Sequence, residues 1–450
     1  MQRVWLGNLF VVVTGFAVAL MATPVSATEA RRASELNPIV FVHGGSGSGT
    51  QFQSQAQRFT SNGYPQHLLR VVEYDSSSIA TILPDVLAQI DAVIAELQES
   101  TGRPQIDLVG HSLGTFVSQA YLATPARAAN VAHYINVDGR VANALPGGVP
   151  TLALFAGAAR AVQGQIVGAT NVTIPDQEHI EVMTSEESFV EMFTFLTGKP
   201  PRTSKIRRSL LARFPVSGRA VIFPQNVGAD GALVLVFEVD RRTGERRRNF
   251  FSRLAFPEAA FTIDETGEFG PFLARRNTHY EFVLLREGVF KHSFYFEPFL
   301  RSDHLVRLNT SIPGEGIDAF IERDDAHAAL SISRNKEFRG DRGAQSDILK
   351  IEGQNVLTPV NARSGFVGAP AAFFAFDVGS DRIDDLATIP TPFGMLAFLT
   401  GADLFIDSSP KNTISIVTVP RGERRNTRFI RVPSRPSTEF RITVQLNDFE

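Results

Sequence analysis

The chain has 450 residues, a formal net charge of -3 and no cysteine. This length exceeds what one hydrophobic core usually organises and predicts about two to three domains. The small net charge argues against a nucleic-acid partner or an anionic membrane surface, and the lack of cysteine excludes disulfides.

Residues 1–27 have the pattern of a secretory signal peptide. A basic start with Arg3 is followed by an apolar run from Leu9 to Met21 and by the small residues Ser26 and Ala27, which suit a signal peptidase. The apolar run is shorter than the ~20 residues of a membrane-spanning helix. We therefore expect a cleaved signal, a chain secreted to the periplasm or the cell exterior, and no integral membrane segment after cleavage.

Residues 36–198 alternate short apolar runs with helical patterns, which predicts an α/β fold with a parallel sheet covered by helices. Apolar residues recur with helical period from Leu83 to Leu97, and residues 184–197 form a second amphipathic pattern. The connections are too short for a multi-helix lid. The predicted strands are residues 38–42, 68–74, 105–109, 131–137, 151–155 and 171–174.

The periodicity changes after a Pro-rich basic linker at residues 199–210. Short β-rich segments separated by Gly, Asp and Asn predict an all-β, sandwich-like region with one or two antiparallel sandwiches. We divide this region into a domain at 211–308 and a second β-rich domain at 309–450. The content of 36 Phe against 6 Tyr fits inward-facing sheet positions.

The run Gly110-His111-Ser112-Leu113-Gly114 follows the predicted strand 105–109 and precedes a helix. This Gly-x-Ser-x-Gly spacing is typical of a nucleophile elbow, in which a sharp turn exposes the serine and side chains at the two glycines would clash with the neighbouring backbone. The pentapeptide alone is a weak signal. Its interpretation depends on partners elsewhere in the chain.

A serine hydroxyl needs an imidazole to take its proton and a carboxylate to orient that imidazole. His179 follows the sixth predicted strand, whereas His133 lies near the beginning of a strand and therefore at the wrong end of the sheet. Asp138 follows the fourth strand and is our candidate acid. Asp176 and Glu178 are alternatives, but they lie so close to His179 in sequence that reaching its ring would be awkward.

A glycine-rich turn, His43-Gly44-Gly45-Ser46-Gly47, ends the first predicted strand. Backbone N–H groups at such a turn can stabilise the oxyanion of a tetrahedral intermediate. We expect the donors to be the N–H groups of Gly45 and Leu113, and we assign His43 and His111 to the support of these loops. We assign no cofactor and no metal ligand.

These motifs resemble those of the α/β-hydrolase lipases and esterases, especially small lidless bacterial lipases and secreted prokaryotic lipases with a β-rich carboxyl-terminal region. The resemblance rests on Val42-His43-Gly44-Gly45, the elbow at Ser112 and the late His179, and it covers roughly residues 36–198. It implies cleavage of carboxylic esters through an acyl-enzyme, with an ester or lipid substrate at an apolar interface. The segment from Ala232 to Phe269 looks like part of a transthyretin-like sandwich, which implies an accessory or covering role.

Two other functions stay open at this point. The chain could be a non-catalytic protein that binds lipid or polymer surfaces on a hydrolase scaffold, with the β-rich half as the binding part. It could also transfer acyl groups to an alcohol, because that reaction uses the same serine, histidine and acid.

Overall fold

A computed structural model of the chain describes residues 36–158, 164–365, 368–409 and 412–447. The proposed signal peptide, residues 1–27, lies outside the described residues. From Leu36 onward the chain forms one compact unit.

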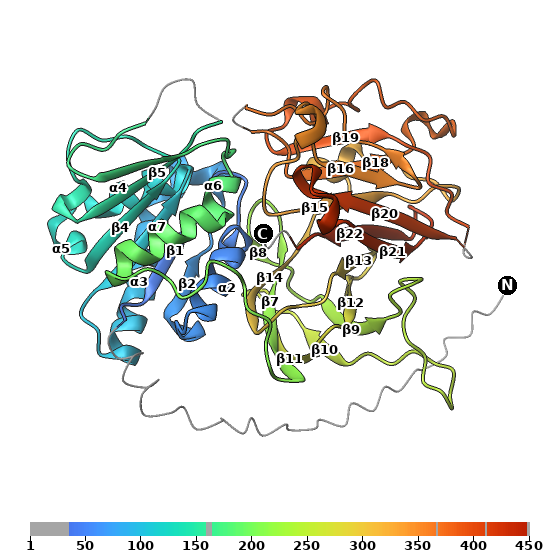
Figure 1. Cartoon of the computed structure of the whole chain (residues 1–450). Helices are drawn as coiled ribbons and strands as arrows, with labels where there is room; N and C mark the ends of the chain where they lie inside the picture. Colours follow the sequence, from blue (N-terminus) through green and yellow to red (C-terminus); the bar gives the residue numbers. More distant parts are fainter. Residues whose placement is uncertain (1–35, 159–163, 366–367, 410–411, 448–450) are drawn as a thin grey trace. The chain divides into compact units, whose positions relative to one another are not determined.

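The amino-terminal sheet has six strands, all parallel, in the order β2-β1-β3-β4-β5-β6 (Figure 1). Every residue of β1, β3 and β5 is buried, as expected for strands that are covered on both faces and read as continuous apolar runs. The predicted α/β fold class is confirmed. The strands are β1 (Ile39–Val42), β2 (Leu69–Val72), β3 (Ile106–His111), β4 (Val131–Val137), β5 (Thr151–Ala156) and β6 (Thr170–Ile174).

Two groups of helices cover the two faces of this sheet. Alternate residues of β1 point to opposite faces, so Val40 packs in one core cluster with α3 and α4, and Phe41 packs in another with α2 and α7. A left-handed Gly102 (φ 68°) ends α3 and a left-handed Gly198 ends α7. The helices are α2 (Gln53–Ser61), α3 (Ile79–Thr101), α4 (Leu113–Leu122), α5 (Pro125–Ala128), α6 (Glu181–Thr184) and α7 (Glu186–Thr197).

One described segment, Ser76–Thr101, is long and apolar enough to cross a membrane by length and composition. This segment contains α3. Its residues Val86, Ile90, Ile94 and Leu97 are buried in the core cluster beside the parallel sheet.

The carboxyl-terminal region is built from three sheets. The largest has eight strands in the order β10-β9-β12-β13-β22-β15-β18-β19, and two smaller sheets have the paths β11-β7-β14, with β8 beside β7, and β17-β16-β20-β21. The strands are β7 (Arg213–Ile222), β8 (Val227–Gly228), β9 (Leu233–Val239), β10 (Ala259–Thr262), β11 (Glu268–Arg275), β12 (His279–Leu285), β13 (Lys291–Phe296), β14 (Asp303–Thr310), β15 (Leu330–Ser333), β16 (Ile348–Ile351), β17 (Gln354–Asn355), β18 (Ala372–Phe376), β19 (Leu399–Asp403), β20 (Thr413–Val419), β21 (Arg428–Pro433) and β22 (Phe440–Gln445).

These sheets are mixed rather than purely antiparallel. The strand β22 pairs in parallel with both β13 and β15, and the pairs β7–β14 and β18–β19 are also parallel. Alternation of apolar and polar residues shows which face of a strand is buried, but it does not show the direction of its neighbour. The expectation of antiparallel sandwiches is wrong for these four pairs.

The eight-stranded sheet contains strands from both sides of residue 308. Its strands β12 and β13 come before this position, and β15, β18 and β22 come after it. The two segments 211–308 and 309–450 thus share one sheet. Their division into two domains stays a prediction.

Phenylalanine rings fill the core between β12 and the small sheet that contains β7. The ring of Phe282 is fully buried and lies 5.7 Å from that of Phe269, 5.6 Å from Phe272 and 5.1 Å from Phe296. Tilted and edge-to-face contacts at these centroid distances are favourable beyond simple area burial. These rings are sheet core, as the composition predicts.

We expect Phe282→Ala to lower the free energy of unfolding by roughly 3–5 kcal/mol, because it leaves a cavity among these rings. Urea unfolding followed by circular dichroism measures the change. Phe250→Ala is the matched control, since Phe250 is 88% exposed, and its effect should stay within about 0.5 kcal/mol. Equal effects of the two substitutions would contradict the assignment of Phe282 to the core.

Candidate active site

Ser112 lies on a strained turn between β3 and α4. Its backbone has φ 52° and ψ -120°, a conformation that residues other than glycine rarely adopt. A Cβ atom at Gly114 would lie 2.1 Å from the carbonyl oxygen of Val42, and one at Gly110 would lie 2.7 Å from that of Gly114. Both glycines are therefore required by close backbone contacts, for the reason that the motif predicts.

His179 and Asp138 reach Ser112 from the carboxyl ends of two other strands. The His179 Nε2 atom lies 2.8 Å from Ser112 Oγ, and its Nδ1 atom lies 2.5 Å from Asp138 Oδ2. The second oxygen of Asp138 accepts the N–H of Ala156 at 3.0 Å. A carboxylate can only accept, so Nδ1 carries the proton and Nε2 is left to accept the serine proton. The structure thus brings the three predicted residues together in hydrogen-bonding order.

The alternative acids point elsewhere. Glu178 is buried, and its two carboxylate oxygens accept the N–H of Gly365, each at 3.0 Å. Asp176 is exposed. His133 pairs with Asp107 at 2.8 Å, at the opposite end of the parallel sheet from Ser112. None of these contacts involves the imidazole of His179.

Two further histidines support the loops around Ser112. His111 Nε2 donates to the carbonyl oxygen of His179 at 2.9 Å, and burial lowers the pKa of His111 to about 3, so its ring is neutral. The ring of His43 stacks on Tyr74 at 4.2 Å and bonds to the carbonyl oxygen of Gly44 at 2.9 Å. Both rings therefore hold backbone groups of the loops around Ser112, which is the role that we expect for them.

The residues that carry the predicted oxyanion donors, Gly45 and Leu113, are neighbours in space. A Cβ atom at Gly45 would lie 4.0 Å from Leu113 Cδ2, its nearest neighbour. Within the described part of the chain, the N–H groups of Gly45 and Leu113 donate to no other group. Leu113 is the first residue of α4, so its N–H also carries the positive end of the helix dipole.

A buried carboxylate from the β-rich region holds the loop that follows His179. Glu337 accepts the backbone N–H groups of Ile180, in a very short bond, and of Glu181 at 3.0 Å. The side chain of Arg339 binds Glu181 at 2.5 Å and also the carbonyl oxygen of Asp176. Nothing in the sequence around Glu337 marks it, because its partners are more than 150 positions away.

A cavity of about 600 Å³ opens beside Ser112 and His179. Its lining includes Gly45 from the amino-terminal part and Phe294, Phe374 and Phe398 from the β-rich part. The ring of Phe398 stacks against that of His179 at 6.0 Å. The β-rich region therefore forms part of the wall of the candidate site.

Comparisons with known proteins agree with this architecture. Residues 36–129 match the family model of lipase (class 2), residues 213–313 match that of the lipase C-terminal domain, and residues 316–450 match a further model of a C-terminal domain. The chain is thus similar to lipases in both its amino-terminal part and its β-rich carboxyl-terminal region, which confirms the resemblance seen in the motifs. No curated protein matches the chain.

Two solved structures show only a remote likeness. Est1E from Butyrivibrio proteoclasticus is 15% identical, covers 37% of this chain and 90% of its own, and has a TM-score of 0.27. Bacillus licheniformis lipase BlEst2 in its propeptide form is 12% identical and has a TM-score of 0.29, and the match covers 88% of this chain and 93% of the lipase. TM-scores this low support no inference about the site.

Burial raises the pKa of the Glu337 carboxyl from 4.5 to about 7. The hydrogen bond from the N–H of Ile180 favours the charged form, but the cost of removing that charge from water is larger. The folded state therefore binds this proton more tightly than the unfolded state. The resulting stability is fully present below pH 4.5 and is lost as the pH rises through about 7. This change lowers the free energy of unfolding by roughly 3 kcal/mol.

The variant Glu337→Gln has no carboxyl to titrate at this position. We therefore expect the free energy of unfolding of the variant to fall less than that of the wild type between pH 4.5 and pH 8. Denaturant unfolding at several pH values measures the difference. Glu265→Gln, at an exposed position, should follow the wild-type curve. Parallel curves for wild type and Glu337→Gln would contradict the raised pKa.

Proposed function

We propose that this protein is a secreted serine hydrolase that cleaves carboxylic esters, with Ser112 as nucleophile, His179 as base and Asp138 as the acid that orients His179. The observation that carries the proposal is the continuous contact from Asp138 through His179 to Ser112, at 2.5 and 2.8 Å. The matches of residues 36–129 and 213–313 to two lipase family models support the same reaction class. Export is proposed from the signal-like pattern of residues 1–27.

In the first half of the reaction, Ser112 Oγ attacks the ester carbonyl carbon and its proton moves to His179 Nε2. Asp138 stabilises the imidazolium that forms. The negative charge on the carbonyl oxygen faces the N–H groups of Gly45 and Leu113. The tetrahedral intermediate then collapses, the C–O bond of the leaving alcohol breaks, and His179 returns the proton to that alcohol.

In the second half, a water molecule attacks the acyl-enzyme while His179 takes one of its protons. Collapse of the second intermediate releases the carboxylic acid and restores the serine hydroxyl. An alcohol in place of water would give a new ester instead. Product analysis distinguishes hydrolysis from this acyl transfer.

The cavity supports an ester with an apolar acyl or alkyl part. Its walls carry Phe294, Phe320, Phe374 and Leu396, all from the β-rich region. Apolar walls favour apolar substrate groups through the hydrophobic effect. We therefore propose that the β-rich region takes part in substrate selection.

Replacing Ser112 with alanine should reduce hydrolysis of p-nitrophenyl butyrate to background, a loss of roughly 10⁶-fold, because the acyl-enzyme can no longer form. Asp138→Asn should lower kcat by roughly 10⁴-fold, because the amide favours the wrong tautomer of His179. Ser100→Ala, at an exposed position on α3, should keep the wild-type rate. Near-normal activity of the Ser112 variant would exclude the proposed nucleophile and favour a binding function.

We further predict that Ala372→Trp shifts the preference toward short acyl chains. Ala372 lies on β18 and lines the cavity, so an indole there occupies space that a long chain needs. The ratio of kcat/KM for p-nitrophenyl laurate to that for the acetate should fall at least about tenfold. Ala260→Trp, exposed on β10, is the control. An unchanged ratio would mean that the acyl chain lies elsewhere.

A further inference from the structure

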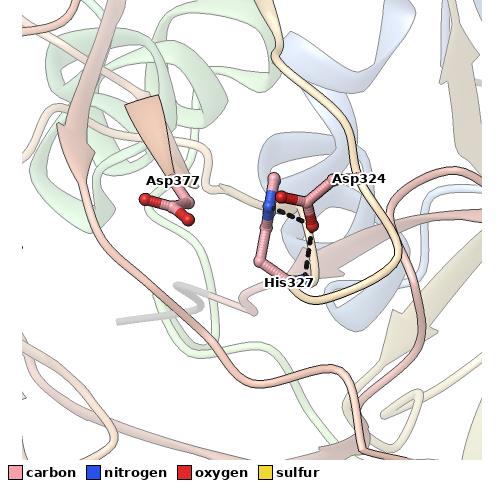
Figure 2. Close-up of side chains that lie close together, drawn as sticks. All are labelled: Asp324, His327 and Asp377. Atoms are coloured by element: carbon pink, nitrogen blue, oxygen red, sulfur yellow. Dashed lines mark hydrogen bonds and ion pairs between the residues drawn. The ribbon is translucent and has the colours of Figure 1, made fainter. Parts of the chain in front are cut away.

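A second group of ionisable side chains lies in the β-rich region, apart from Ser112. Asp324 and His327 belong to the segment before β15, and Asp377 directly follows β18. Figure 2 shows the three side chains side by side. One possible ligand atom from each residue lies within 4.8 Å of those of the other two.

The imidazole of His327 is buried and presents its Nδ1 atom to this cluster. Its Nε2 atom lies 3.1 Å from the carbonyl oxygen of Glu322. A carbonyl oxygen can only accept, so Nε2 carries a hydrogen, and Nδ1 is the ring nitrogen that faces the two carboxylates. Nδ1 has no hydrogen-bond partner among the described residues, although Asp324 Oδ1 lies 2.9 Å away.

When Nδ1 carries no hydrogen, this arrangement places its lone pair against a carboxylate oxygen, and either a proton on Nδ1 or a bound cation removes the repulsion. An outer hydrogen bond from the ring N–H to a backbone carbonyl is also how metal-binding histidines are usually oriented. The ring is thus held with its free nitrogen toward the acidic group.

Among the described residues, the two carboxylates have no lysine or arginine partner. Asp377 is 0% exposed and, of the groups that the structure describes, it accepts only the backbone N–H of Arg382, at 3.1 and 3.2 Å. In the part of the chain that the structure describes, neither Asp324 nor Asp377 forms an ion pair with lysine or arginine. A buried carboxylate without a counter-charge, such as that of Asp377, is costly, and a divalent cation would neutralise both groups.

We propose that Asp324, His327 and Asp377 bind a divalent transition-metal ion, Zn²⁺ by preference. One imidazole nitrogen and two carboxylate oxygens are ligands that Zn²⁺ takes, whereas Ca²⁺ prefers six to eight oxygens. Ligands about 2.1 Å from one ion lie at most about 4 Å apart, so the present spread of up to 4.8 Å closes by small side-chain rotations. Water completes the coordination.

The position of the site indicates a structural role. In the antiparallel pair of β15 and β18, Leu330 faces Ala375 and Ser333 faces Ala372. The three ligands lie beyond the Leu330 end, whereas Ser333 and Ala372 line the cavity beside Ser112. The ion would therefore join the segments before β15 and after β18, at the end of the pair that is remote from the proposed nucleophile.

The test uses the full-length protein, stripped with a chelator and dialysed into a buffer that does not bind metals. Titration calorimetry with ZnCl₂ and with CaCl₂, together with metal analysis after gel filtration, measures the affinity and the number of ions bound. We expect one Zn²⁺ per chain at a site that Ca²⁺ does not fill, and a higher Tm with Zn²⁺.

Asp377→Asn should weaken Zn²⁺ binding at least tenfold and remove the increase in Tm. Asp384→Asn is the matched control, because Asp384 is exposed in the same segment and only accepts the N–H of Phe405, and it should bind as the wild type does. If Asp377→Asn does not fold, as judged by circular dichroism, Asp324→Asn at a half-exposed position takes its place.

Two results would overturn the proposal. One is the absence of stoichiometric Zn²⁺ from the wild-type protein. The other is equal Zn²⁺ affinity in the wild type and the Asp377 or Asp324 variant, which would place the ion elsewhere on the chain.

Discussion

The geometry at Ser112 depends on a buried ionic contact between the two halves of the chain. The loop after His179 is held by Glu337 through its backbone, while Glu181 in that loop binds Arg339 at 2.5 Å and Arg421 at 3.1 Å. Buried charges are costly to desolvate, and removal of one partner leaves the other unpaired. The β-rich half is therefore required to fix the position of His179, and it also supplies part of the cavity wall.

The parts of the site that follow from local constraints could be predicted from the sequence. A side chain at Gly110 would clash with the backbone of Gly114, which is close in sequence, and a side chain at Gly114 would clash with Val42, because α4 passes close to β1. The order of Ser112, Asp138 and His179 follows from the order of parallel strands, because strand ends at one edge of a sheet lie near one another. These rules need no knowledge of the second half.

Other parts carry no local signal. Helix α2 buries Gln55 and Arg58, which donate to the carbonyl oxygens of Met183 and Thr184, beside its apolar residues, so polar side chains interrupt the apolar pattern of its inward face. Glu337 and Asp377 are ordinary acidic residues in sequence, and only distant segments give them partners. The direction of β22 is set by neighbours far away in the chain, which is why the parallel pairs were missed.

The position of β22 also determines when the largest sheet can be completed. This strand lies between β13 and β15, yet it is formed by residues that come long after both of them. During synthesis, β13 and β15 therefore have no shared neighbour until Phe440–Gln445 has left the ribosome. Because both strands carry residues that line the cavity, this wall of the cavity is among the last features to assemble, and a growing chain holds the loop of Ser112 before the cavity beside it is closed.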